Sequence, residues 1–240
     1  MHRSAVAAIV LTLAVHAAGA PGAAAQAPYR ASWWDAAAVA TAGVLAAIPA
    51  AAGLPHGPPP CAPCDPASLP GIDHAALHTF SGPASTASGV LLAGVAGFAG
   101  LASLEGASAA QARGRAVVFA NSLAWTLAAT EWVKVLAHRS RPVLYTTQAP
   151  AAASEPDNRR SFPSSHASLA FAAATSYLVM AQRERLPHRT RNAVLLYAGA
   201  LGVAALRVAG GEHFPTDVAG GASLGAGIGW LAARVHSTGP

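Results

Sequence analysis

Charged residues, aromatic residues and cysteines are all scarce in this 240-residue sequence, and each scarcity narrows the possible functions. Only 10% of the residues are charged and 6% are aromatic, although the formal net charge is +5. No basic stripe with interleaved aromatic residues occurs, which argues against a nucleic-acid partner. No strand-like alternation with hairpin signals occurs either, so we expect an all-α fold.

Apolar residues make up 53% of the chain and are arranged in runs, although abundant Ala and Gly keep the mean hydropathy at +0.38. The runs occupy residues 36–53, 86–104, 115–137, 165–182, 193–209 and 217–234. Their lengths suit short membrane spans, and glycines spaced along two of them favour close helix packing. We therefore predict a bundle of about six apolar helices, embedded in a membrane.

The N-terminus has the pattern of an export signal. Met1-His-Arg3 precedes an apolar run to Ala20, and Ala23-Ala-Ala25 resembles a small-residue cleavage site. We predict a signal peptide over residues 1–25, with an uncleaved signal anchor as the alternative.

A second region, residues 26–85, combines the first apolar run with a Pro-rich loop that holds the two cysteines, Cys61 and Cys64. A Cys-x-x-Cys pair can be a disulfide, a redox pair or half of a zinc site. Zinc requires two further ligands at suitable spacing, and export favours oxidation. A disulfide in an exported loop is therefore the favoured interpretation.

Polar residues cluster most densely between Arg207 and Asp217. His213 and Asp217 are four residues apart, so in a helix the carboxylate would reach the imidazole. A histidine held in this way can present its other nitrogen as a nucleophile or base. Arg207 adds a planar fork of donors that suits a phosphate-like anion.

Two further stretches suit the same anion. Lys134 and Arg141 are seven residues apart, which in a helix would place them near one face, with Pro142 ending that helix. Ser164 precedes an apolar helical run and reads as its N-cap, where free backbone N–H groups favour an anion. His166 follows directly.

Taken in order, K-x6-RP, PS-x-H and R-x5-H-x3-D resemble the motifs of the superfamily of phosphatidic acid phosphatase type 2 enzymes and vanadium haloperoxidases. They span Lys134 to Asp217, within a catalytic region that we place at residues 86–240. Two positions depart from the usual pattern. Ser165 replaces a common Gly, and Leu206 replaces a common Ser.

The resemblance implies a site in which Lys134, Arg141 and Arg207 surround a phosphoryl group, aided by Ser164 and the amides of Ser164, Ser165 and His166. It also implies that His213 attacks phosphorus, that Asp217 orients His213, and that His166 protonates the leaving group. No metal or other cofactor is required, because the three cations neutralise the phosphate. The residue types alone indicate only an anion site and a His–Asp pair.

The expected function is hydrolysis of a lipid phosphate, of the phosphatidate or isoprenoid diphosphate type, through a phosphohistidine. The alternatives are a soluble periplasmic acid phosphatase, a haloperoxidase carrying vanadate in the same cage, and a scaffold or transport protein with an anion pocket.

Gly221-Ala-Ser223-Leu-Gly225 matches the serine-hydrolase pattern G-x-S-x-G, but it lies in a helical run without a preceding strand. Helix packing explains it better. Glu131 could pair with Lys134, whereas Glu212 and His138 match no functional position.

Positive residues favour the cytoplasmic side of a membrane, and Arg113, Arg115 and the basic stretch 183–191 then lie inside. The site would face the periplasm of a bacterial-type inner membrane. Cleavage after Ala25 conflicts with this orientation if 36–53 crosses the membrane, because the site would then face inward.

Overall fold

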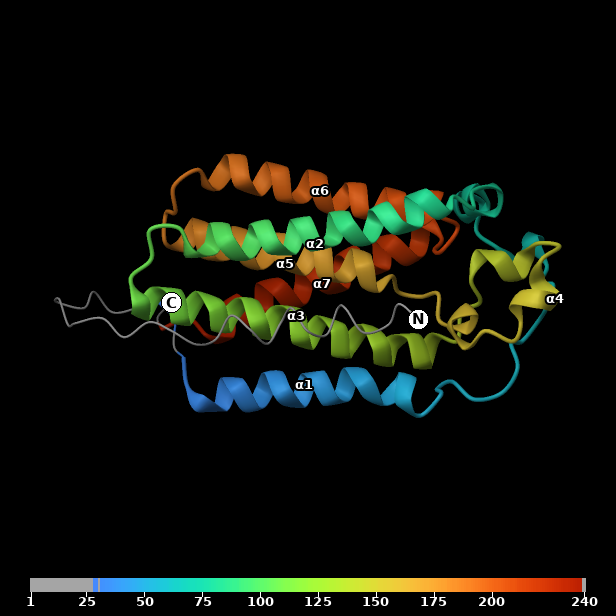
Figure 1. Cartoon of the computed structure of the whole chain (residues 1–240), viewed down its shortest axis with the longest axis horizontal. Coiled ribbons are helices and arrows are strands. Elements are labelled where there is room, and N and C mark those ends of the chain that lie inside the picture. The colour runs from blue at the N-terminus through green and yellow to red at the C-terminus, as the bar shows by residue number, and fades with distance from the viewer. Residues whose placement is uncertain (1–27, 30, 239–240) are drawn as a thin grey trace.

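The computed structural model describes residues 28–29 and 31–238, and this part of the chain is predominantly helical (Figure 1). Its long helices are α1 Trp33–Ala51, α2 Gly82–Leu104, α3 Ala109–Ala137, α5 Ser165–Arg183, α6 Arg189–Ala209 and α7 Pro215–Val235. Each coincides with one of the six apolar runs. The predicted all-α bundle is confirmed, whereas the predicted signal peptide lies outside the described residues.

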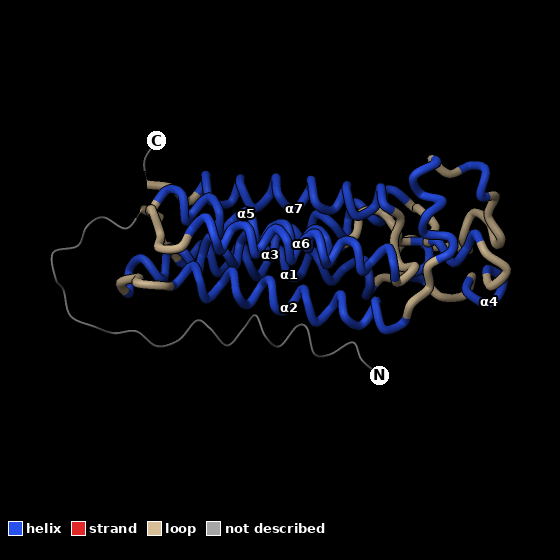
Figure 2. The backbone as a smooth tube through the Cα atoms, turned by 90° about the horizontal axis from the view of Figure 1, so that it is seen from above, coloured by secondary structure: helices blue, strands red, loops and turns tan. Residues whose placement is uncertain are grey.

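The six long helices lie along one common axis, and the remaining elements lie at one end of the bundle (Figures 1 and 2). These elements are η1 Pro66–Ser68, η2 Gly71–His78, η3 Pro142–Tyr145, α4 Ala149–Ala152 and η4 Pro156–Arg159. We call this end the loop end; it comprises residues 52–81, 138–164 and 210–214. The opposite end, the turn end, holds the short connections 105–108 and 184–188.

The first apolar run forms a complete helix that crosses the length of the bundle beside α3 (Figure 1). Pro49 lies in the last turn of α1, so the hydrogen bond that it cannot donate is missing only near the helix end. Trp132 of α3 donates its indole N–H to the carbonyl of Leu45 at 3.0 Å. At the turn end, the Asp35 carboxylate lies 2.9 Å from His236. Tyr29 therefore lies at the turn end, and α1 runs the full length of the bundle from there to the loop end.

The helix of the first motif ends earlier than the sequence suggested. Residue His138 adopts a left-handed conformation, with φ of 48°, and α3 stops at Ala137 rather than continuing to Pro142. Lys134 therefore lies in the last turn of α3, whereas Arg141 lies beyond the helix, in the 138–164 segment.

Three glycines of α7 bring it into backbone contact with α5. A Cβ atom at Gly225 would lie 1.9 Å from the carbonyl oxygen of Ser168, and one at Gly221 only 2.6 Å from that of Ser164. Gly229 meets Ala172 in the same way, at 2.8 Å. Ser223 donates to the carbonyl of Ala219 within the same helix, so helix packing accounts for the G-x-S-x-G pattern.

The close approach of α5 and α7 sets their first turns side by side. The backbone N–H of Ser164 donates to the carbonyl of Asp217 at 3.0 Å. Ser164 caps α5 as predicted, its hydroxyl accepting from the N–H of Ala167. The second and third motifs are thereby joined through the backbone.

Three of the long helices, α1, α2 and α6, are long and apolar enough to cross a membrane. Large apolar side chains are exposed along the bundle, including Val44, Val90, Leu101, Leu136, Leu201 and Leu231. An apolar exterior of this kind is compatible with embedding of the bundle in a membrane.

We expect Gly225→Ala to destabilise the protein by about 1–3 kcal/mol, because its methyl group would collide with the backbone of α5. The matched control is Gly227→Ala, where nothing lies within 4 Å of the added methyl group. The control should be neutral or slightly stabilising, since Ala is the better helix former. Thermal unfolding in detergent measures both, and equal stability of the two variants would contradict the packing argument.

Candidate active site

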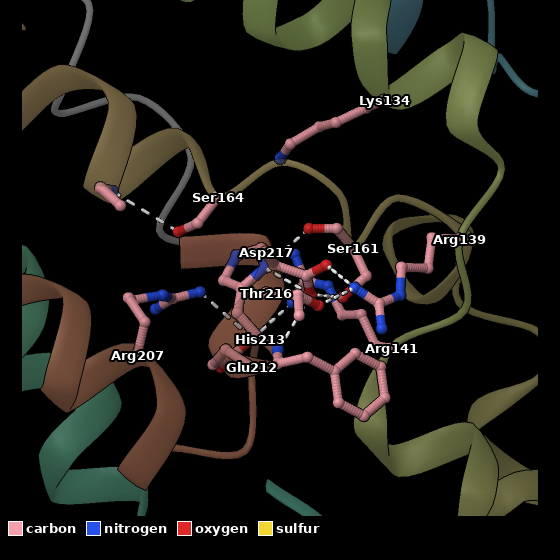
Figure 3. Close-up of polar contacts among 12 residues, drawn as sticks. Lys134, Arg139, Arg141, Ser161, Ser164, Arg207, Glu212, His213, Thr216 and Asp217 are labelled. Carbon is pink, nitrogen blue, oxygen red and sulfur yellow. Dashed lines mark hydrogen bonds and ion pairs between the residues drawn. The ribbon is translucent and has the colours of Figure 1, made fainter. Parts of the chain in front are cut away.

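The three motifs meet at the loop end (Figure 3). Lys134 comes from the end of α3, Arg141 from the 138–164 segment and Arg207 from the last turn of α6. Ser164, Ser165 and His166 open α5, and His213 and Asp217 flank the start of α7. The structure thus brings together every residue that the sequence assigned to the site.

Two arginines of the site share one carboxylate. Glu212 accepts an ion-paired hydrogen bond from Arg141, and its Oε2 lies 3.3 Å from Nη2 of Arg207. Two hydroxyls on α2 also contact Arg207, since Oγ of Ser85 and Oγ of Ser88 each lie 3.3 Å from Nη1. The cluster is largely shielded from solvent, with Arg207 only 6% exposed.

Lys134 belongs to a neighbouring group organised by Glu131. Its ammonium lies 3.5 Å from Oε1 of Glu131, which is the pairing that the sequence suggested. The same carboxylate binds the guanidinium of Arg160 and accepts a 2.9 Å hydrogen bond from the Ser165 hydroxyl. Ser165, the residue that replaces a common Gly, therefore connects the first turn of α5 to α3.

A backbone carbonyl, rather than Asp217, accepts the hydrogen bond of the His213 ring. Nδ1 of His213 lies 2.8 Å from the carbonyl oxygen of Ser161 and 3.6 Å from the nearest oxygen of Asp217. A carbonyl oxygen only accepts hydrogen bonds, so Nδ1 carries the proton and Nε2 keeps its lone pair. The expectation that Asp217 orients His213 through a direct contact is corrected in this respect.

Asp217 is occupied by other donors. Its Oδ2 accepts from the hydroxyl of Ser161 at 2.5 Å and from the N–H of Phe214 at 2.9 Å, and its Oδ1 accepts from Arg139 at 2.5 Å. Because α7 begins at Pro215, His213 precedes the helix and the helical four-residue spacing does not apply to the pair. Asp217 instead caps the first turn of α7 and holds Ser161, whose carbonyl holds His213.

Arg139 links the site to the Pro-rich loop. Its second terminal nitrogen donates to the fully buried Asp73 of η2 at 2.6 Å. Asp73 also accepts from the backbone N–H of Thr216 at 3.0 Å and from its hydroxyl at 2.7 Å. The loop is therefore fixed directly to the turn that carries the candidate nucleophile.

A second anchor holds the beginning of the same loop. Cys61 and Cys64 are joined by a disulfide, with Cα atoms 4.8 Å apart. The N–H of Cys64 donates to the carbonyl of Leu144 at 2.7 Å, and the two residues share an apolar cluster with Ala149. The Pro-rich loop and the 138–164 segment consequently pack as one unit over the end of the bundle.

Electrostatics keep the His213 ring neutral. Burial is the largest cause that holds the pKa of His213 well below its usual value. The nearby cations Arg141, Lys134 and Arg207 lower this pKa further. A neutral imidazole with an unprotonated Nε2 is the form that can attack phosphorus.

His166 occupies the second position of α5, next to α2. Its Nε2 lies 3.9 Å from the point where a Cβ atom of Gly89 would stand. Arg207, Lys134 and Glu212 are the strongest charges around it. A histidine among the same charges as His213 is suitably placed for proton transfer at the same anion.

Several residues of the site escaped the sequence analysis. Arg139 and Arg160 were not assigned to the site, and Glu212 matched no functional position. Asp73 and Ser85 lie far from the motifs along the chain and carried no signal. Only the local charge density around Arg139 to Arg141, unusual in so apolar a chain, could have drawn attention to this network.

A protein-family model matches the second half of the chain. The model of the PAP2 superfamily matches residues 115–239, which contain all three motifs. No match was found among curated proteins or among solved structures. Within the described residues, no group of His, Cys, Asp and Glu side chains is arranged to hold a metal ion.

The depressed pKa of His213 predicts a loss of stability on acidification. The unfolded chain takes up this proton near pH 6.5 and the folded chain only at lower pH, so stability is full above pH 6.5 and falls as the pH decreases. The slope contributed by one proton is at most about 1.4 kcal/mol per pH unit. We expect His213→Gln to lose less thermal stability between pH 7 and pH 5 than the parent, measured without phosphate. Identical slopes would contradict the assignment.

Proposed function

Because the chain belongs to the PAP2 superfamily, whose members are phosphatases, it is a phosphoric ester hydrolase at that level, and we propose that it acts on a lipid phosphate through a phosphohistidine. One observation carries the proposal. His213 has an unprotonated Nε2 at the end of a hydrogen-bonded support and lies near three cations, of which Lys134 and Arg207 are buried. This is the combination that attack on a negatively charged phosphoryl group requires.

In the first step, Nε2 of His213 donates its lone pair to phosphorus and the bond from phosphorus to the leaving oxygen breaks. His166 takes up a proton when the substrate dianion offsets the charges of Arg207 and Lys134, and it gives that proton to the leaving oxygen. The product then leaves as an alcohol or, from a diphosphate, as a phosphate ester. Lys134, Arg141 and Arg207 bind the non-bridging oxygens, whose charge they stabilise in the transition state. Nδ1 of His213 keeps its proton and donates it in a hydrogen bond to the Ser161 carbonyl. Oδ2 of Asp217, 3.6 Å from Nδ1, offsets the positive charge of the phosphorylated ring.

In the second step, a water molecule attacks the phosphohistidine. His166, now neutral, takes a proton from that water as the new bond to phosphorus forms and the N–P bond breaks. Inorganic phosphate leaves, and His166 regains the proton needed for the next cycle.

The surface around the loop end supports a lipid as the source of the phosphoryl group. Leu136, two residues beyond Lys134, is 80% exposed, and Phe80 next to the start of α2 is 44% exposed. Apolar side chains at these positions would let an acyl or isoprenoid chain remain in the membrane while its head group reaches the cations.

The distribution of charge and cysteine supports a site that faces the periplasm. The disulfide lies at the loop end, and disulfides persist in oxidising compartments. Arg185, Arg189 and Arg191 lie at the turn end, where positive residues favour the cytoplasm. Since α1 separates Tyr29 from the loop end, this orientation keeps Tyr29 inside and is incompatible with export of a new N-terminus after Ala25.

We expect phosphate release from phosphatidate, phosphatidylglycerol phosphate or undecaprenyl diphosphate to exceed that from a soluble aryl phosphate, compared as kcat/KM in detergent. His213→Ala should lower the rate at least about a thousandfold, because the nucleophile is lost. His56→Ala, an exposed histidine of the same loop end, should retain activity. Equal release by His213→Ala would contradict the mechanism. Preference for the aryl phosphate with full activity in a detergent-free extract would favour the soluble phosphatase.

The orientation can be tested by labelling introduced cysteines, since the native pair is oxidised. Ala75→Cys is exposed at the loop end and Thr190→Cys at the turn end. In intact cells a membrane-impermeant maleimide should label the first variant, and it should label the second only after permeabilisation. The reverse pattern would mean that the site faces the cytoplasm.

A further inference from the structure

In the proposed function, Lys134, Arg141 and Arg207 bind the substrate phosphate, and we call these three side chains the phosphoryl cage. A side chain of the protein itself occupies part of this cage. Glu212 lies between Arg141 and Arg207 (Figure 3), and its Oε2 contacts both guanidinium groups. Its Oε1 accepts a 2.8 Å hydrogen bond from Ser85 of α2. Both carboxylate oxygens are therefore bound by groups that the proposed function assigns to, or places beside, the substrate phosphate.

The carboxylate leaves part of the cage unused. The Nε atoms of Arg141 and Arg207 are buried and have no hydrogen-bond partner in the part of the chain that the structure describes. Lys134 contacts Glu131 rather than Glu212. A planar carboxylate offers two oxygens, whereas a tetrahedral phosphoryl group offers three non-bridging oxygens and up to two negative charges. The phosphoryl group can therefore use donors that Glu212 leaves unsatisfied.

Glu212 is also the member of the cage with the most direct route to solvent. Its side chain is 28% exposed, compared with 15% for Arg141 and 7% for Arg207. Burial alone would raise the pKa of its carboxyl, but Arg141, Arg207 and the Ser85 hydroxyl together hold that pKa below the ordinary value. Glu212 is therefore ionised when a phosphate approaches, and the two anions compete for the same guanidinium groups.

We propose that Glu212 is an internal competitor for the phosphoryl cage, displaced toward solvent when substrate binds, and that it restricts the site to dianionic phosphoryl groups. This inference rests on the proposed function, because it assumes that the arginine pair receives the phosphate. Carboxylates and singly charged phosphodiesters offer no more charge than Glu212 and would not replace it. A phosphomonoester dianion offers more charge and more acceptor oxygens, so it can displace Glu212 at concentrations at which weaker anions cannot.

The test compares anion binding by Glu212→Gln with binding by the parent, both in a His213→Ala background so that binding is separated from turnover. Calorimetric titration of the detergent-solubilised protein with inorganic phosphate should show about tenfold tighter binding to the Glu212→Gln protein. Dimethyl phosphate and acetate, which we expect to bind the parent more weakly, should gain by a similar factor. Glu212→Ala should shift affinity in the same direction and serves as a second variant if Glu212→Gln folds poorly.

The matched control is Asp65→Asn, a carboxylate-to-amide change at the same loop end. Asp65 is exposed and its carboxylate accepts from the backbone N–H of Ala67, so this variant should show no gain in phosphate affinity. Unchanged or weaker binding by both Glu212 variants would overturn the inference and make Glu212 a support of the arginines. If neither the His213→Ala parent nor its variants bind phosphate, the proposed function itself fails.

Discussion

The site depends on the contact between α5 and α7, in which glycines let two helix backbones touch. Gly221, Gly225 and Gly229 leave no room for a side chain against α5, so the register of the two helices is set by shape alone. That register places Ser164 over the carbonyl of Asp217 at the point where both helices begin. Packing along the bundle and this hydrogen bond together position the candidate nucleophile beside the N-terminus of α5.

Balance of charge is the second constraint, because the loop end concentrates cations away from water. Five of them are matched by buried or half-buried carboxylates. Arg139 is paired with Asp73 and Asp217, Arg160 and Lys134 with Glu131, and Arg141 and Arg207 with Glu212. Uncompensated charges at such burial would oppose folding strongly. These ion pairs therefore let the folded chain hold several cations close together without a bound anion.

The sequence alone predicted the features that depend on residues close together in the chain. Apolar runs located all six long helices, and Ser164 was identified as a helix cap from the residues that follow it. Contacts between distant segments left no such pattern. Asp73 and Arg139 are 66 residues apart, and Ser85 and Glu212 are 127 apart. The error over His213 and Asp217 has a local cause, since a helical spacing was assumed where the helix had not yet begun at Pro215.

The family model starts at Arg115, yet α2 and the Pro-rich loop lie outside it and supply Ser85, Ser88 and Asp73 to the loop end. A fragment reduced to the matched residues would retain every motif residue while stripping Arg207 and Arg139 of these partners. Divergence in the unmatched half can therefore retune the reaction centre without altering a motif. Related chains with identical motifs need not share a substrate, and the segment before α3 is where their differences should be sought.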